Sequence, residues 1–271
     1  MRLKITTFLF AGLSIVAFAT HAQKLPKVQK TSVRAPENIK IDGELSEWNG
    51  QFHAYNRGNH LYYTVSNDDN NLYLVAHMDN GVGNTKIFKG GLTFTIIPPA
   101  KKANSLLITF PAITNKATIE ADQLQMNQLI YKRLKSDTIA NKTKIDSLIS
   151  SSNNLISKVY NQILVTGIPE TNEPLMSINN TQGIRVAGLF DRDMNYTYEL
   201  AIPIKYLDAT LNNGENFKYN IKLNTHGVVK IKNFQSFDPP LIPVTAQSNP
   251  DDLFLNYTTD FSGEYTLAKK Q

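Results

Sequence analysis

Clusters of side-chain oxygen atoms are the part of this sequence best suited to chemistry. Asp68 and Asp69 lie in one polar segment, and Asp191 and Asp193 lie in another. Calcium takes about six to eight oxygen ligands, so acidic loops of this kind suit it. Because Asn and Asp are also the ordinary residues of turns, we interpret residues 68–71 as a turn. Asp191 and Asp193 remain as candidate metal ligands, with calcium as the candidate ion.

Other metal or catalytic chemistry is not indicated. The chain contains no cysteine, which excludes catalytic thiols, disulfides and cysteine-bound metal. Its five histidines show no zinc-like spacing. The sequence has no G-x-S-x-G elbow and no glycine-rich phosphate loop, and it indicates no carboxylate pair placed across a cleft. These observations favour a protein that is not an enzyme.

The N-terminal residues predict export. Two basic residues precede an apolar run over residues 5–19, and small residues then precede Gln23. A basic start, a short apolar core and a small-residue exit are typical of a signal peptide, here residues 1–22. The apolar run is shorter than the ~20 residues that a transmembrane helix needs. We expect a periplasmic or extracellular protein of bacterial type, with no transmembrane segment after signal removal.

The charge balance argues against nucleic acid as a partner. Loss of Arg2 and Lys4 with the signal peptide reduces the 28 basic residues to 26, against 23 acidic ones. Nucleic-acid-binding proteins usually carry a dense basic face, and so balanced a chain does not predict one.

Period-two patterns predict that the chain is mainly β. Leu61–Val65 and Leu72–Met78 flank a polar turn at Asn67–Asn71, which is the pattern of a β-hairpin. In Phe217–Asn224 apolar and polar residues alternate, which predicts a strand with one buried face and one solvent-exposed face, as in an antiparallel sandwich. Residues 23–37 lack any such pattern, and we interpret them as a linker. Further strands are expected at 92–97, 106–110, 183–190, 196–202 and 261–267.

The period changes to that of a helix in the middle of the chain. Apolar residues from Ile145 to Ile163 recur at a spacing of three or four, and residues 124–134 show a more ragged stripe. Because strands occur on both sides, we expect about residues 118–162 to form a helical hairpin inserted in a domain that spans residues 38–271. The apolar stripe is expected to pack on the sandwich. The predicted fold is an antiparallel β-sandwich, jelly-roll or immunoglobulin-like, with this insertion.

Three segments resemble a known family. Ile39–Trp48 contains I-D-G-x-x-x-E-W, similar to the opening of family 9 carbohydrate-binding modules and of the related DOMON-like sandwiches. Asn71–Asp79 resembles their second strand, and Tyr198–Leu207, which contains E-L-A-I-P, resembles a later strand that ends in proline. Together the segments frame residues 38–230. The resemblance implies a non-catalytic exported module that binds carbohydrate.

The resemblance also indicates what a sugar site would need. Family members that bind sugar hold the ring between two aromatic side chains, typically tryptophans, and carry calcium. Trp48 is the only tryptophan here and belongs to the fold motif, so we expect it to close one end of the sandwich core. Tyrosine is then the substitute for a sugar platform. The candidate ligand-binding residues are Tyr55, Tyr62, Tyr63, Tyr73 and Tyr257.

Two alternatives to carbohydrate binding stay open. The first is a structural or protein-interaction module of the cell envelope that has lost the sugar site, which the shortage of tryptophan favours. The second is a b-type haem-binding redox domain, because some DOMON-like sandwiches hold haem with an axial methionine and histidine. Met78 and His226 would be that pair, although Met78 shares a strand face with Leu72 and Leu74, as a core methionine does.

Overall fold

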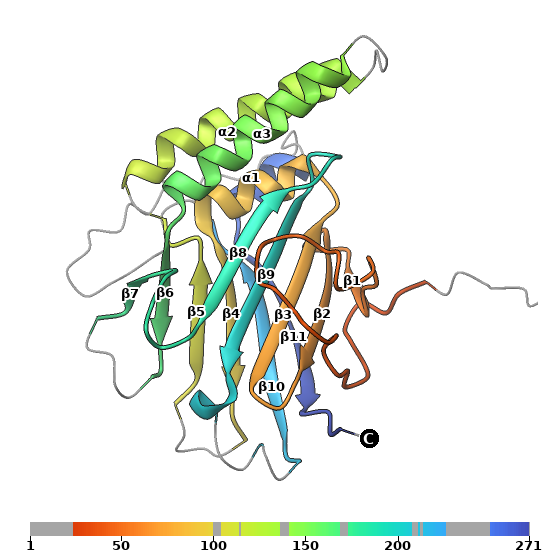
Figure 1. Ribbon diagram of the computed structural model, residues 1–271, viewed down its shortest axis with the longest axis vertical. Coiled ribbons are helices and arrows are strands. Elements are labelled where there is room, and N and C mark those ends of the chain that lie inside the picture. Colours follow the sequence, from red (N-terminus) through yellow and green to blue (C-terminus); the bar gives the residue numbers. More distant parts are fainter. Residues whose placement is uncertain are drawn as a thin grey trace, which may run out of the picture.

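The chain folds into an antiparallel β-sandwich of two sheets with helices at one end (Figure 1). This confirms the predicted fold class. The expected signal peptide, residues 1–22, and His226 lie outside the part of the chain that is described. The computed structural model describes residues 24–99, 104–113, 115–135, 141–168, 173–207, 211, 214–225 and 250–270.

One sheet has five strands in the order β1-β2-β3-β9-β8, all antiparallel. The predicted hairpin forms, with Asn67 opposite Leu72. Strand β3 then pairs on its other edge with β9, which places Leu74 opposite Leu200. The strands are β1 (Ala54–Asn56), β2 (Leu61–Asn67), β3 (Asn71–Met78), β8 (Arg185–Phe190) and β9 (Tyr196–Pro203).

The other sheet has six strands in the order β11-β10-β4-β5-β6-β7. The alternation predicted for residues 217–224 is observed, because Phe217, Tyr219 and Ile221 are all buried while Lys218 is exposed. Ile163, which the helical stripe included, instead lies in β6 and pairs with Met176. The strands are β4 (Leu92–Ile97), β5 (Leu106–Phe110), β6 (Gln162–Thr166), β7 (Leu175–Ser177), β10 (Asn216–Leu223) and β11 (Thr259–Thr266).

The main core lies between the two sheets. Tyr63 of the first sheet and Tyr219 of the second meet there, with their hydroxyl oxygens 3.0 Å apart. Met78 is fully buried in the same core, with Leu72 and Leu74 on its strand face. This arrangement explains why the inward positions of the central strands are large and apolar.

Helix α1 (Gly81–Gly90) follows β3 directly and was not predicted, because its three glycines and mixed polarity give no helical period. Asn80 caps it, since the Asn80 side chain accepts a 2.8 Å hydrogen bond from the Gly83 nitrogen. Gly90 packs so closely on the Asn224 carbonyl that an added Cβ would clash. The helix therefore closes one end of the sandwich.

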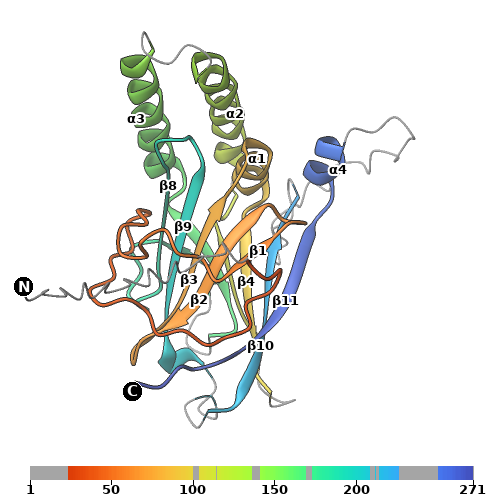
Figure 2. The same ribbon diagram turned by 90° about the vertical axis from the view of Figure 1, so that its right-hand side faces the viewer.

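Two longer helices, α2 (Asn115–Lys135) and α3 (Lys142–Val159), stand between β5 and β6 in the sequence and lie side by side beyond α1 (Figures 1 and 2). On α3 the apolar stripe packs against the main core, with Ile156 buried. On α2 the side chains of Met126 and Leu129 remain 53 % and 48 % exposed. No described helix combines the length and the apolar character needed to cross a membrane.

Residues 24–37 are not the linker that the sequence suggested. Strand β2 extends further than β1, and this segment takes the place of β1 along the remaining edge. The Gln29 side chain donates to the Val65 carbonyl (2.7 Å) and accepts from the Val65 nitrogen (2.8 Å). Arg34 forms a parallel bridge with Asn67. A free edge of β2 would expose unpaired backbone N–H and C=O groups, which can pair with another chain. Residues 24–37 bond to these groups, and those bonds hold the segment in place.

The remaining N-terminal segment crosses the outer face of the five-stranded sheet (Figure 2). Trp48 is only 6 % exposed and packs there against Tyr73, Val75 and Ala201. Its ring meets the ring of Tyr73 edge-on, with centroids 6.3 Å apart. The sequence led us to expect that Trp48 closes one end of the main core, and this prediction is wrong. Trp48 belongs to a second, smaller core on the opposite side of the sheet.

Candidate functional site

The second core contains a buried carboxylate, Glu199 of β9. Its Oε1 accepts a 2.6 Å hydrogen bond from the Trp48 Nε1, and its Oε2 accepts from the backbone nitrogens of Gly43 (2.8 Å) and Asp42 (3.1 Å). Burial raises the pKa of Glu199 to about 6. Every donor comes from the N-terminal segment, so this carboxylate fastens the segment to the sheet and is not open to a ligand.

An aromatic row crosses three strands of the same sheet. Tyr55 of β1, Tyr62 of β2 and His77 of β3 stand directly opposite one another. Because side chains alternate along a strand and Tyr63 points into the main core, these three side chains lie on the outer face. The rings of Tyr55 and Tyr62 stack with centroids 4.3 Å apart. We call Phe52, Tyr55, Tyr62 and His77 the aromatic row.

Phe52 joins the row from the N-terminal segment. Its ring centroid lies 5.8 Å from that of Tyr62 and 5.8 Å from that of His77. All four members are half-buried, unlike the fully buried tyrosines of the core. The row is therefore a continuous aromatic surface that is partly exposed to solvent.

Polar groups border the aromatic row. The Tyr55 hydroxyl donates to Asp79 Oδ2, and His60 Nδ1 lies 3.3 Å from Asp79 Oδ1. Burial, together with this bond to Asp79, raises the pKa of Tyr55 to about 12, so its hydroxyl stays protonated. On the other side, Asp191 Oδ2 lies 4.0 Å from the His77 Nδ1. Burial lowers the pKa of His77, so the imidazole is neutral near pH 7.

The other predicted tyrosines lie elsewhere. Tyr63 is fully buried between the sheets, and Tyr73 is 5 % exposed with its hydroxyl donating to Asp68 Oδ2 (2.7 Å). Tyr63 is structural, so its assignment as a ligand-binding residue is wrong, whereas Tyr73 does not join Tyr55 and Tyr62 in the aromatic row. Tyr257 lies after α4 (Pro250–Asn256), and its carbonyl accepts a 2.7 Å hydrogen bond from Lys86. Only Tyr55 and Tyr62 are brought together.

Asp191 and Asp193, the candidate calcium ligands, both have protein partners in this structure. Asp191 Oδ1 accepts hydrogen bonds from the backbone nitrogens of Asp193 (2.8 Å) and Asn195 (2.9 Å), which is a turn. Asp193 Oδ1 accepts from Lys135 Nζ at 2.9 Å, and that bond holds the pKa of Asp193 below its usual value. Within the described residues, no group of three or more acidic or histidine side chains could hold a metal ion. The two carboxylates thus serve a turn and an ion pair here, and calcium binding by them stays a prediction.

The haem alternative gains no support at Met78. Its side chain is fully buried and lies against Gly83 of α1 so tightly that a Cβ at that position would clash with it. A methionine packed in this way leaves no room for a porphyrin on its sulfur. Its proposed partner His226 lies outside the described residues.

Two members of the aromatic row were missed at the level of sequence. His77 carried a signal, because it alternates with Met78 and so faces away from the core side of β3. Phe52 carried none, since it lies in irregular structure where no period applies.

In comparisons with known proteins, no family model, no curated protein and no solved structure matches this chain. Function is therefore inferred from the geometry of its own residues.

Proposed function

We propose that this protein is an exported, non-catalytic binding module that recognises carbohydrate at the aromatic row. The stacked pair Tyr55 and Tyr62, continued by Phe52 and His77 across the outer sheet face, is the observation that carries the proposal. A sugar ring presents an apolar C–H face and polar hydroxyl edges. Tyrosine matches it, because its ring offers apolar area and its hydroxyl offers a hydrogen bond.

The border of the row supplies the polar half of such a site. Asp79 and His60 stand at one side, and Asp191 stands at the other. Carboxylates accept hydrogen bonds from sugar hydroxyls, and an imidazole can hydrogen-bond to them as well. The resemblance to family 9 carbohydrate-binding modules supports the same ligand class, with tyrosine and phenylalanine in place of the missing tryptophans.

Binding measurements on the mature protein test the proposal. A glycan array would find the saccharide, and calorimetry would then compare the wild type with Tyr55→Ala and Tyr62→Ala. Each variant should weaken binding by about 5- to 30-fold, because each loses roughly 1–2 kcal/mol of aromatic contact. Tyr62→Phe keeps the ring and should retain most of the affinity.

Tyr206→Ala is the matched control for these variants. Tyr206 is a half-buried tyrosine that follows β9, about 20 Å or more along the strand from the position opposite His77. Its loss should leave the affinity for a neutral saccharide bound at the aromatic row unchanged. Equal loss in Tyr206→Ala and Tyr62→Ala, or wild-type affinity in both alanine variants of the row, would contradict the proposal.

The interaction-module alternative is favoured by one observation. Met126, Leu129 and Ile130 recur at helical spacing on α2 and stay largely exposed, which gives the helix pair an apolar stripe. A stripe of this kind is typical of a protein-contact surface. Oligomeric state in solution, compared between the wild type and Leu129→Asp, separates this function from the first.

A further inference from the structure

A cleft of about 700 Å³ lies at the other end of the outer sheet face from the aromatic row. Its floor is one cross-strand row of β3, β9 and β8, in which Tyr73, Ala201 and Arg185 stand opposite one another. Ile39 and Ile41 of the N-terminal segment form one wall. This volume falls within the roughly 300–1,000 Å³ of small-molecule sites.

The charge of the cleft is one-sided. Arg185 and Lys205 line it, and no carboxylate does so among the described residues. The Arg185 side chain is exposed, and it makes no hydrogen bond or ion pair with the part of the chain that is described. Lys205 Nζ lies 4.8 Å from the centroid of the Tyr206 ring and has no acidic partner there. Two uncompensated cations therefore face one hollow.

The polar walls are held in place by the fold. The Ile204 nitrogen donates to the Asn70 carbonyl (2.8 Å), and the Tyr206 hydroxyl donates to the Gln182 carbonyl (3.0 Å). These bonds use the backbone oxygens of Asn70 and Gln182, both of which line the cleft, and the Gln182 amide oxygen also accepts a 3.4 Å hydrogen bond from the Thr181 hydroxyl. A wall fixed in this way loses little freedom when a ligand binds.

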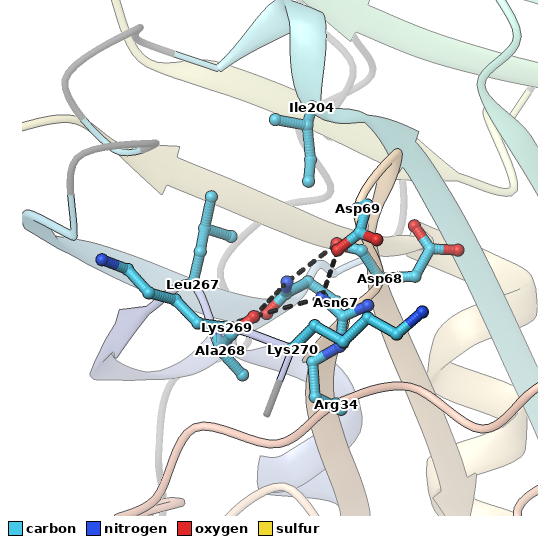
Figure 3. Close-up of a pocket in the computed structure, with 9 residues that line it drawn as sticks. All are labelled: Arg34, Asn67, Asp68, Asp69, Ile204, Leu267, Ala268, Lys269 and Lys270. Atoms are coloured by element: carbon cyan, nitrogen blue, oxygen red, sulfur yellow. Dashed lines mark hydrogen bonds and ion pairs between the residues drawn. The ribbon is translucent and has the colours of Figure 1, made fainter.

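A smaller hollow of about 300 Å³ adjoins the cleft across the β2–β3 turn (Figure 3). Lys269 and Lys270 line it, and Arg34 stands across it from Ile204. Its acids are already engaged. Asp69 pairs with Arg34 at 2.8 Å, and Asp68 accepts from two backbone nitrogens and the Tyr73 hydroxyl. Three basic residues therefore line this hollow against two acidic ones.

We propose that the cleft binds a carboxylate-bearing saccharide, such as a hexuronate unit. The planar guanidinium of Arg185 matches a carboxylate with two parallel hydrogen bonds, and Lys205 adds a second charge. The amides of Asn70 and Gln182 both donate and accept, which suits hydroxyl groups, whereas sulfate or phosphate oxygens only accept. Ile39 offers an apolar wall to the ring. That the ligand is a saccharide rests on the proposed function. That the ligand is negatively charged rests only on the basic residues of the cleft.

Calorimetry with a panel of oligouronates tests this, with each acid compared against its methyl ester. The ester keeps the sugar and removes the charge. We expect the best acid to bind at least about tenfold more tightly than its ester, and to weaken between about 0.05 M and 0.5 M salt. Arg185→Gln and Lys205→Gln together should lose at least about tenfold in affinity for the acid and almost nothing for the ester.

The control pair Lys218→Gln and Lys222→Gln makes the same change in net charge on β10 of the other sheet, and it should bind the acid like the wild type. Three outcomes would overturn the inference: equal affinity for an acid and its ester, no binding by any oligouronate, or an equal loss of affinity for the acid in both variant pairs. Tighter binding of a sulfated saccharide or an oligonucleotide would overturn the ligand class. Tyr62→Ala distinguishes the two proposals: if it keeps acid binding while neutral sugars never bind, the aromatic row fails and the cleft stands.

Discussion

Trp48 and Glu199 are joined by a 2.6 Å hydrogen bond across 151 residues of sequence. The indole lies in the N-terminal segment and the carboxylate lies in β9. Their pairing holds a covering segment on a sheet face that would otherwise be exposed.

Replacement of Trp48 by alanine should destabilise the protein without removing ligand binding. The change empties the second core and leaves Glu199 buried with one donor fewer, so we expect a loss of about 3–5 kcal/mol in the free energy of unfolding. Urea denaturation would measure it. A Trp48→Ala protein that unfolds like the wild type but no longer binds saccharide would make Trp48 a ligand contact instead.

Stability should depend on pH through Glu199. Its pKa is raised by burial from 4.5 to about 6, so the native protein binds a proton more readily than the unfolded chain between these values. The contribution of this group to stability is therefore present at low pH and declines as pH rises through that window, by at most about 2 kcal/mol.

Glu199→Gln isolates this effect, because the variant cannot titrate at this position. The variant should be less stable than the wild type, since an amide nitrogen would face N–H donors. Its deficit should shrink between about pH 4 and pH 7.5, as the wild type loses its own contribution. Unfolding curves at both pH values check this, and a deficit that does not change with pH would refute it.

Lys86 of α1 is a buried amine that forms no ion pair with an acidic residue in the described part of the chain. Its Nζ donates to the Tyr257 carbonyl (2.7 Å) and to Thr259 Oγ1 (2.8 Å), and it lies 4.0 Å from the centroid of the Phe254 ring. Burial lowers the pKa of Lys86 from 10.5 to about 7. The unfolded chain therefore binds more protons than the native protein between these values, and stability rises with pH across them.

Lys86→Met removes that titration while keeping the length of the side chain. The wild type should gain stability relative to the variant as pH rises from about 7 to about 10. Thermal unfolding at the two pH values measures the difference. If the stability difference between the wild type and Lys86→Met stays constant, or if the wild type loses stability relative to the variant as pH rises, Lys86 is not buried as described.

The apolar stripe of α3 should matter to the monomer. Leu148 and Leu155 pack against the main core, so their joint replacement by aspartate should lower the free energy of unfolding by about 3 kcal/mol. Met126→Asp with Leu129→Asp on the exposed side of α2 is the control, and it should leave the melting temperature nearly unchanged. Light scattering would measure the oligomeric state of the same variants. If the α3 variant kept its melting temperature while a dimer dissociated, the α3 stripe would be an interface between two copies of the protein, and the prediction would be wrong.

Strand alternation and helical period were visible in the sequence because they are local. The buried face of β10 and the apolar stripe of α3 both follow from spacing along a few turns or pleats. Helix α1 escaped notice because its formation depends on the Asn80 cap and on close contact between glycines and neighbouring elements. Those contacts join distant residues, and no local period reports them.

The sequence alone determined that Tyr62 and Tyr63 lie on opposite faces of one strand, because successive side chains of a strand point to opposite sides. Only the tertiary structure decided which face was open to solvent. The N-terminal segment covers the middle of the outer face, so Val75 and Glu199 are as buried there as the inward residues, while Tyr62 beside Tyr55 is only half-buried. The covering segment and the sheet are far apart in the sequence, so no local pattern reports their contact. Alternation along a strand therefore gives the face on which a side chain lies, but not whether that side chain is exposed.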